Sequence, residues 1–112
     1  MARNRLLQTP PYPVTQTLLR LGENLRTARV RRRLTIDEVA QKIGTGRRAV
    51  MDAENGNPST GIAVYAALLW AYDLLSPLAD VANPTKDEQG LIFAAAKEKK
   101  RVRKIGDLDN DF

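Results

Sequence analysis

The sequence predicts an all-α fold, a bundle of about five to six helices. Two features predict it. Apolar residues recur at steps of three and four in successive stretches, as they do on one face of a helix. Short motifs that start or stop helices lie between these stretches. Apolar and basic residues alternate only briefly, over residues 102–105, so no strand is predicted.

The chain of 112 residues suffices for one compact domain with tails. We expect a flexible basic arm over residues 1–14, a helical domain over residues 15–82, and a C-terminal helix with a charged tail over residues 83–112. A domain of this size buries only a modest core, and burial between two subunits would add to it. The size therefore favours a dimer.

The composition argues against an enzyme. The chain has no Cys and no His, which excludes thiol nucleophiles, disulfides and the common zinc and haem sites, and removes the most common general base. Paired carboxylates lie at residues 37–38, in the first turn of a predicted helix, and at residues 107 and 109, in a flexible end. Neither pair makes a preorganised site. We expect no catalytic residue, no metal and no cofactor.

No targeting or spanning segment is evident, because the longest apolar run, residues 62–72, is about half a membrane-spanning length. A cytoplasmic protein without membrane contact is the simplest expectation. The formal net charge is +5, and residues 1–33 hold eight Arg against one acid. Such a cationic surface favours a polyanion, usually nucleic acid, as partner. A solvated basic face that keeps the protein in solution is the alternative.

The N-terminal arm is expected to be extended, because Pro10, Pro11 and Pro13 block a helix. With Arg3 and Arg5, it is either a disordered terminus or a basic arm along a nucleic-acid groove. A first helix is predicted from about residue 15 to residue 32. Its apolar stripe consists of Leu18, Leu21, Leu25 and Ala28.

The second predicted helix starts at a capping box, Thr35 with Glu38, and ends at Gly44, which is expected to be left-handed. Its buried face consists of Ile36, Val39, Ala40 and Ile43. A third helix over residues 47–54 follows a short turn. Val50 and Ala53 point inward at helical spacing. The residues left outside are Arg47, Arg48, Met51 and Asp52.

Residues 55–58, Asn-Gly-Asn-Pro, then break the chain. Ser59 or Thr60 can cap a fourth helix that reaches about Tyr72 and is apolar almost all round, so it should be central or shared with a partner chain. Ser76 with Pro77 starts a short fifth helix, which residues 83–84 end. A second capping box, at residues 85 and 88, opens a sixth helix whose signal fades over residues 97–104.

Residues 34–44 (LTIDEVAQKIG), followed by Val50 and residues 53–56 (AENG), resemble the phage-repressor (Xre/Cro-type, lambda repressor-like) helix-turn-helix family over about residues 18–74. The resemblance implies a repressor that binds double-stranded DNA sequence-specifically. Its second motif helix would lie in the major groove and its first would brace against the DNA backbone.

The resemblance places the base-reading positions on Arg47 and Arg48, with Asp52 one turn on. Arg can pair with guanine at two atoms, and Asp52 either accepts from cytosine or orients Arg48. The chain departs from the family at two positions. The family often has Gln where this chain has Ile36, and Ser or Thr where this chain has Gly46, which puts one phosphate contact in doubt. The expected DNA-binding residues are Thr35, Lys42, Thr45, Gly46, Arg47, Arg48, Met51, Asp52, Asn57, Ser59 and Thr60. Residues 31–33, all Arg, either add phosphate contacts or are solvated.

Arg29 and Glu54 match a family ion pair that ties the first helix to the end of the third. The alternative for Arg29 is a charge that faces DNA. Dimerisation is expected on an inverted repeat, with the reading helices about 34–36 Å apart. The expected dimer interface is Trp70, Leu74, Leu75 and Leu78. For Trp70, a place in the subunit's own core is an equal alternative.

The segment after the motif, over residues 74–79, 83–91 and 101–103, resembles HipB-type antitoxins, which repress their own operon and bind HipA-like Ser/Thr kinase toxins. On this interpretation Phe112 and the tail acids contact the toxin; otherwise they form a solubilising end. A stand-alone regulator without a toxin is the alternative function. A pure protein-interaction module is a third, against which the outward Arg47 and Arg48 argue.

Overall fold

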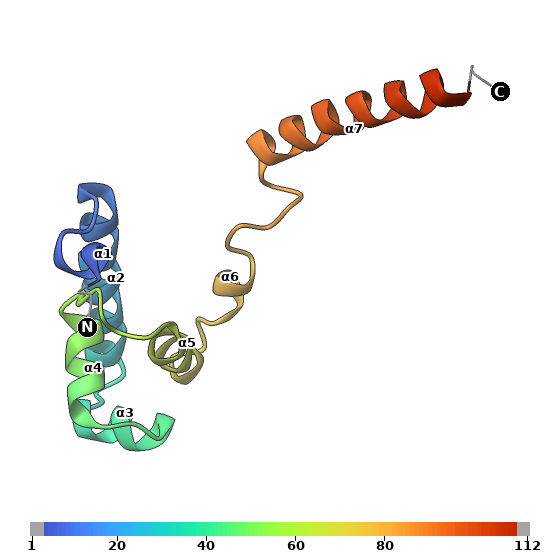
Figure 1. Cartoon of the computed structure of the whole chain (residues 1–112). Coiled ribbons are helices and arrows are strands. Elements are labelled where there is room, and N and C mark those ends of the chain that lie inside the picture. Colours follow the sequence, from blue (N-terminus) through green and yellow to red (C-terminus); the bar gives the residue numbers. More distant parts are fainter. Residues whose placement is uncertain (1–3, 110–112) are drawn as a thin grey trace. The chain divides into compact units, whose positions relative to one another are not determined.

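The computed structural model describes residues 4–109, and the side chains of residues 4–101. This part of the chain forms helices α1 (Arg5–Gln8), α2 (Tyr12–Arg31), α3 (Ile36–Ile43), α4 (Arg47–Glu54), α5 (Ile62–Ala71), α6 (Ser76–Ala79) and α7 (Glu88–Asp109) (Figure 1). It contains no strand, so the all-α prediction is confirmed. The chain divides into two units, Met1–Leu78 and Ala79–Phe112.

Helix α1 and the start of α2 lie within residues 1–14, where the sequence predicted an extended segment. Asn4 caps α1, because its side chain accepts a hydrogen bond from the Leu6 backbone N–H at 3.0 Å. Helix α2 begins at Tyr12, three residues before the predicted start, with Pro11 as its N-cap. Pro13 falls in the first turn, where a missing N–H costs nothing. The prolines therefore start α2 rather than preventing it.

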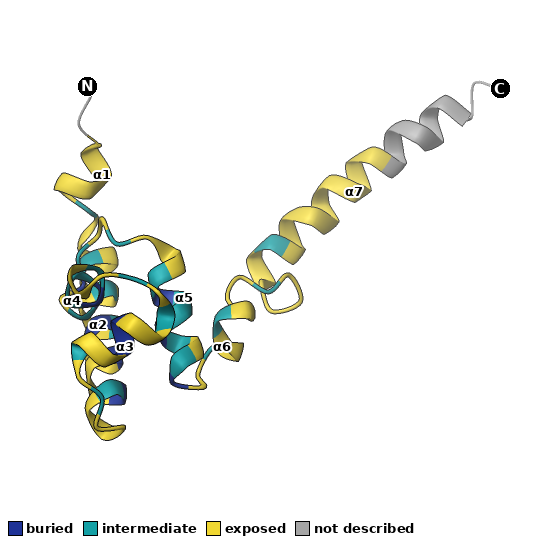
Figure 2. Ribbon diagram, turned by 90° about the horizontal axis from the view of Figure 1, so that it is seen from below, coloured by how far each residue is buried: buried dark blue, intermediate teal, exposed yellow. Residues whose placement is uncertain are grey.

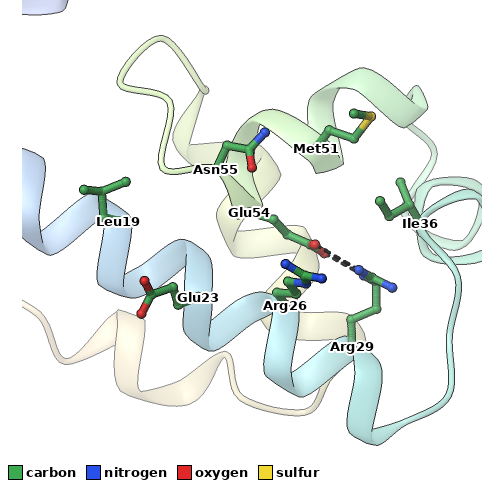
Figure 3. A pocket seen from close by; sticks show the side chains of 8 residues that line it. All are labelled: Leu19, Glu23, Arg26, Arg29, Ile36, Met51, Glu54 and Asn55. Atoms are coloured by element: carbon green, nitrogen blue, oxygen red, sulfur yellow. Dashed lines mark hydrogen bonds and ion pairs between the residues drawn. The ribbon is translucent and has the colours of Figure 1, made fainter.

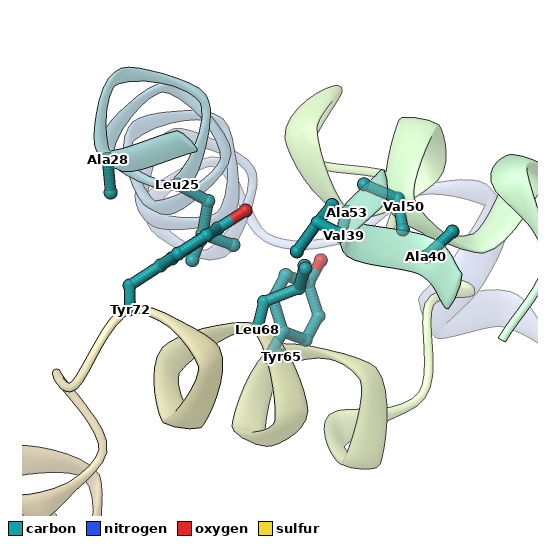
Figure 4. Close-up of a cluster of buried hydrophobic side chains, with 9 residues drawn as sticks. All are labelled: Leu25, Ala28, Val39, Ala40, Val50, Ala53, Tyr65, Leu68 and Tyr72. Carbon is teal, nitrogen blue, oxygen red and sulfur yellow. The ribbon is translucent and has the colours of Figure 1, made fainter. Parts of the chain in front are cut away.

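The core of the first unit lies between helices α2, α3, α4 and α5 (Figure 4). Its buried apolar side chains are Leu25, Ala28, Val39, Ala40, Val50, Ala53, Tyr65, Leu68 and Tyr72. Six of them belong to the apolar faces predicted for the first three helices, whereas four other residues of those faces are only half-buried: Leu18, Leu21, Ile36 and Ile43. Helix α5 is central as predicted, but on one face only, because Ile62 and Trp70 remain exposed.

Helices α2 and α4 approach so closely that their backbones are in contact range. A Cβ at Gly22 would lie 2.8 Å from the Ala53 carbonyl oxygen, and still closer to that of Glu54. Just beyond α4, Gly56 has a φ of +70° and would place a Cβ 2.9 Å from the Leu18 carbonyl oxygen. Two glycines thus set the distance between these helices.

Two predicted helix caps are wrong. The N-cap of α5 is Gly61, not Ser59 or Thr60. Instead, the Asn57 side chain accepts hydrogen bonds from the Ser59 N–H at 2.9 Å and the Ser59 hydroxyl at 2.7 Å. This local turn competes with the predicted cap, and the Thr60 hydroxyl is left buried without a partner.

At the start of α7, the expected capping box of Thr85 with Glu88 does not form. Thr85 donates its hydroxyl to Asn83 at 2.8 Å, and Asp87 instead accepts from the Gly90 N–H at 3.0 Å. Helix α7 continues to Asp109, through the stretch where the helical signal was expected to fade. Ala, Lys, Glu and Arg are strong helix formers, which accounts for the extension.

Helix α7 buries no side chain among residues 88–101, as Figure 2 shows. Leu91, Ile92 and Phe93 are 51%, 67% and 65% exposed. Over the described residues, no helix combines the length and apolar character needed to cross a membrane.

Candidate nucleic-acid interface

Helix α3 begins at a complete capping box, as predicted. The Glu38 N–H donates to the Thr35 hydroxyl, and the Thr35 N–H donates to the Glu38 carboxylate, both at 3.1 Å. Val39 and Ala40 are buried on the inner face. The Thr35 hydroxyl, a predicted DNA contact, is therefore already engaged as a helix cap.

The turn between α3 and α4 depends on Gly44. Its φ of +80° lies in the left-handed region that side chains disfavour, as the sequence predicted. The N–H groups of Gly44 and Thr45 both donate to the Ala40 carbonyl, at 3.0 and 2.9 Å. These bonds end α3 and bring the chain into α4 within three residues.

Helix α4 has a buried face and an exposed leading end. Val50 and Ala53 are fully buried, whereas the side chains of Arg47 and Arg48 are 59% and 86% exposed. The two candidate base-reading arginines therefore point away from the core. This is the orientation that a helix entering a DNA groove requires.

Each of these arginines has a carboxylate partner. Arg48 Nε lies 3.4 Å from Asp52 Oδ1, one turn along α4. Arg47 Nη1 donates to Asp37 Oδ2, in the first turn of α3, at 3.0 Å. This second pair was not predictable from the sequence, because only the crossing of α3 and α4 creates it. Exposed pairs of this kind contribute about 0–1 kcal/mol, so a stronger partner can replace them.

The N-terminus of α4 has no side-chain cap. Gly46 occupies the N-cap position, where it offers no hydroxyl or carboxylate, and no acid lies in the first turn. The leading N–H groups of a helix have no intrahelical acceptor and carry the positive end of the dipole. Together with Arg47 and Arg48, they make this end of α4 attractive to an anion.

Arg29 and Glu54 tie α2 to the end of α4 (Figure 3). Arg29 donates through Nε and Nη2 to the two carboxylate oxygens of Glu54, at 2.6 and 3.0 Å, and through Nη1 to the Leu34 carbonyl at 2.9 Å. The hydrogen bond to Glu54, which outweighs the effect of burial, raises the pKa of Arg29. Both side chains are almost buried, so Arg29 is not a charge that faces solvent.

An open groove of about 400 Å³ lies beside this ion pair, between α2 and α4. Figure 3 shows Met51 and Ile36 together at one end of it. Ile36 also packs against the core, which explains an apolar residue at this position. Met51, a predicted DNA contact, is only half-exposed and lines this groove.

The other predicted contacts differ in their availability. Lys42 and Ser59 are exposed, Thr45 and Asn57 are half-buried, and the Thr60 hydroxyl is buried. Asn57 also accepts a 3.5 Å hydrogen bond from the Tyr65 hydroxyl through its carbonyl. The exposed cations among the predicted contacts are therefore Lys42, Arg47 and Arg48, and each of the two arginines is paired with a carboxylate.

The three arginines at the end of α2 are not equivalent. Arg32 donates to the Tyr72 and Ala28 carbonyls at 2.8 and 2.9 Å and lies over the Tyr72 ring, 5.4 Å from its centroid. It holds the end of α5 against α2. Arg31 and Arg33 are exposed and remain candidates for phosphate contacts.

The predicted dimer residues lie at the end of α5 and after it. Trp70 is 58% exposed and Leu74 is 43% exposed, while Leu75 and Leu78 are half-buried. The alternative that Trp70 belongs to the core of its own subunit is wrong. Phe112, the predicted toxin contact, lies outside the described residues.

A family model described as a helix-turn-helix domain matches residues 20–82, more than half of the chain. No curated protein and no solved structure matches the chain significantly. The matched segment contains α3 and α4 complete, and α7 lies beyond it.

Proposed function

This chain belongs to the helix-turn-helix domain family, and from that premise we propose that it is a sequence-specific repressor of transcription. A helix-turn-helix domain suggests a DNA-binding regulator. One observation supports the specific proposal most strongly: Arg47 and Arg48 stand exposed at the leading end of α4, whose opposite face is buried. Among the described residues of the first unit, no other helix has two adjacent exposed arginines in its first turn.

Arg47 and Arg48 would read base edges in the major groove, which is about 12 Å wide and accepts one helix. A guanidinium can donate to guanine O6 and N7 together, a contact worth roughly 1–3 kcal/mol of discrimination. On binding, the Arg47 guanidinium exchanges Asp37 for guanine, whereas Arg48 can keep its Nε on Asp52 and donate through its terminal nitrogens. Asp52 would then orient Arg48 rather than contact a base, since a carboxylate near phosphates is unfavourable.

Phosphate contacts would fix the position of α4 in the groove. The uncapped N–H groups after Gly46 can donate to a phosphate oxygen, as can the exposed side chain of Lys42, whereas the Ser59 hydroxyl would first have to leave Asn57. Arg31 and Arg33 can add charge to this set. With several such contacts, affinity should fall steeply as salt concentration rises.

The repressor would act as a dimer on an inverted repeat, with two copies of α4 in successive major grooves about 34–36 Å apart. Support for the dimer comes from Trp70 and Leu74, two large apolar side chains four residues apart in the sequence, which are both exposed. Bound in this way, the dimer blocks polymerase. Sedimentation of Trp70→Ala beside wild type tests the interface; a wild-type monomer at micromolar concentration contradicts it.

The test of the function is selection of bound duplexes from a random pool. Wild type should select one motif, and Arg48→Ala should lose preference at a guanine position, by roughly 5- to 150-fold. Arg20→Ala, which removes an exposed arginine from α2, is the matched control and should keep the motif. If Arg48→Ala selects the same motif with undiminished preference, α4 does not read DNA through this residue.

A narrower form of the proposal is an antitoxin that binds a HipA-like kinase and represses the operon of both. It is supported by the resemblance after residue 74 and by Leu91, Ile92 and Phe93, which are exposed in α7 as a protein contact would need. A kinase-like reading frame beside this one, and co-purification with its product, would support it. Deletion of residues 106–112 tests Phe112, and unchanged kinase affinity would exclude that contact. A stand-alone regulator is the other outcome.

A further inference from the structure

The second half of α7 holds a concentrated positive charge. Between residues 97 and 104 the sequence has six basic residues and one acid, a net charge of +5, equal to that of the whole chain. We propose that α7 is a second DNA-binding element that contacts the phosphates flanking the site bound by α4. The inference rests on the proposed function only in that both elements bind one duplex.

The described cations of this segment are free to bind. The side chains of Lys97, Lys99, Lys100 and Arg101 are exposed. Among the side chains of residues 4–101, no carboxylate lies within ion-pair distance of them. At 100° per residue they cover an arc of about 200° around the helix, and Glu98 falls outside that arc. One broad face of α7 is therefore cationic.

The dimensions of this face suit a duplex. Eight residues of helix extend about 12 Å, and B-DNA carries one charge per 1.7 Å of axis, so the segment lies against roughly seven phosphates. A cationic arc wider than half the circumference can meet phosphates on both sides of a groove. We expect these contacts to be independent of DNA sequence. A Lys ammonium is a point charge that contacts phosphates and does not pair with base edges at two atoms.

A membrane surface fits this helix less well. Surface helices place their apolar residues on one side, opposite the charges. In α7, Leu91, Ile92 and Phe93 follow one another, so they point in directions about 100° apart. Two of the three lie within the arc of the cations. The charge pattern therefore favours a polyanion in solution, and the first unit of this chain already binds one under the proposed function.

The link to the first unit makes this contact effective. Only residues 80–87 separate α6 from α7, and they are internally bonded: the Asp80 carboxylate accepts from Lys86 and, at 2.7 Å, from Asn83. A short tether turns the second contact into an intramolecular one with a high local concentration. Weak phosphate contacts by α7 then add to the affinity of the whole chain.

The test compares the full chain with a variant in which Lys97, Lys99, Lys100 and Arg101 are all replaced by Gln, which preserves helix propensity. Dissociation constants are measured from 50 to 200 mM salt on a selected duplex and on a random one. The slope of log K against log salt should become shallower by about two to four. Affinity should fall at least roughly tenfold on both duplexes, leaving their ratio unchanged.

A charge-preserving variant, with Arg at residues 97, 99 and 100 and Lys at residue 101, is the matched control and should bind as wild type does. Extending the duplex by about one helical turn on each side should strengthen wild-type binding and not that of the Gln variant. An unchanged salt slope in the Gln variant overturns the proposal. The proposal is also overturned if the substitutions weaken only the binding of anionic vesicles, because α7 would then contact a membrane surface.

Failure of the two ideas gives different results. If no duplex is selected from the pool and Arg48→Ala changes nothing, the proposed function fails. A shallower salt slope in the Gln variant would still support DNA binding by α7 in that case. If selection succeeds and the Gln variant matches wild type in slope and in its response to flanking sequence, only the role of α7 fails.

Discussion

Two long helices of this chain, α2 and α7, differ in what holds them. They have 20 and 22 residues, and both combine apolar and basic side chains. Helix α2 buries Gly22, Leu25 and Ala28 against other helices, whereas α7 buries no side chain among residues 88–101. The position of α2 is thus fixed by its own packing. Between residues 88 and 101, α7 has its surface available for a partner.

The sequence pattern accounts for this difference. In α2 the inward apolar residues, Leu18, Leu21, Leu25 and Ala28, are spaced by three and four, so they share one face. In α7 the large apolar residues are consecutive, and the cations that follow surround much of the helix. Spacing decides whether similar residues make a core or a surface. Paired substitutions in packed and exposed positions test this view.

The largest effect is expected when Arg29 of α2 loses its carboxylate partner on α4. Glu54→Ala leaves Arg29 almost buried without a carboxylate and should lower the free energy of unfolding by about 3–5 kcal/mol. Glu98→Ala, in the exposed part of α7, should change it by less than about 0.5 kcal/mol. Urea unfolding measures both. Equal effects would mean that the tie between α2 and α4 does not stabilise the fold.

The next largest difference is expected when a leucine is replaced by alanine in each of the two helices. Leu25 is 1% exposed and Leu91 is 51% exposed. Leu25→Ala should cost about 2–5 kcal/mol, since it removes buried contacts and leaves a cavity. Leu91→Ala should cost a small fraction of that in the isolated chain. A large cost at Leu91 would contradict this difference, because it would show that Leu91 is packed against other residues.

A smaller change of opposite sign is expected at Tyr72, whose backbone carbonyl binds Arg32 of α2. Its hydroxyl is buried without a partner, so Tyr72→Phe should stabilise the protein by about 1 kcal/mol. Tyr65→Phe is the control and should not stabilise, because the Tyr65 hydroxyl has an acceptor. If Tyr72→Phe destabilises the fold, the hydroxyl makes a favourable interaction after all.

Tyr72 also predicts a pH dependence. Burial, the main cause, raises the pKa of its hydroxyl above the ordinary value of about 10. The folded protein then retains a proton that the unfolded chain loses. Stability from this source is full below about pH 10 and declines as pH rises through the raised pKa. Melting temperatures from pH 8 to 11 should show a smaller alkaline decline in Tyr72→Phe than in wild type.

The smallest effect is expected at the start of α4. Asp37→Asn removes the carboxylate that holds Arg47 and one negative charge near the expected phosphates. DNA affinity should increase by about two- to fivefold, the range of an exposed ion pair. Asp73→Asn, an exposed acid after α5, is the control. Weaker binding by Asp37→Asn would instead show that the pair positions Arg47 for its contact.

Local rules predicted most of the first unit. The capping box at Thr35, the left-handed Gly44 and the buried face of α4 follow from residues close in sequence, and the structure has all three. The sequence could not predict the approach of α2 to α4 at Gly22, or the pairing of Asp37 with Arg47. Both depend on how two helices cross.

The errors in the second half have a different cause. At the starts of α5 and α7 two local hydrogen-bonding patterns compete, and the Asn turns at Asn57 and Asn83 form in place of the expected caps. The difference between such patterns is small, and sequence alone does not rank them. Helix α7 also lacks the apolar period that would have fixed its length in advance.

The backbone contact at Gly22 has a consequence for engineering. It holds α4 by its rear face, together with Val50 and Ala53, and involves no side chain that points toward a ligand. Residues 47, 48 and 52 can therefore be exchanged as a cassette while the scaffold behind them stays constant. Under the proposed function, libraries at these three positions should yield new DNA sequence preferences with little loss of stability.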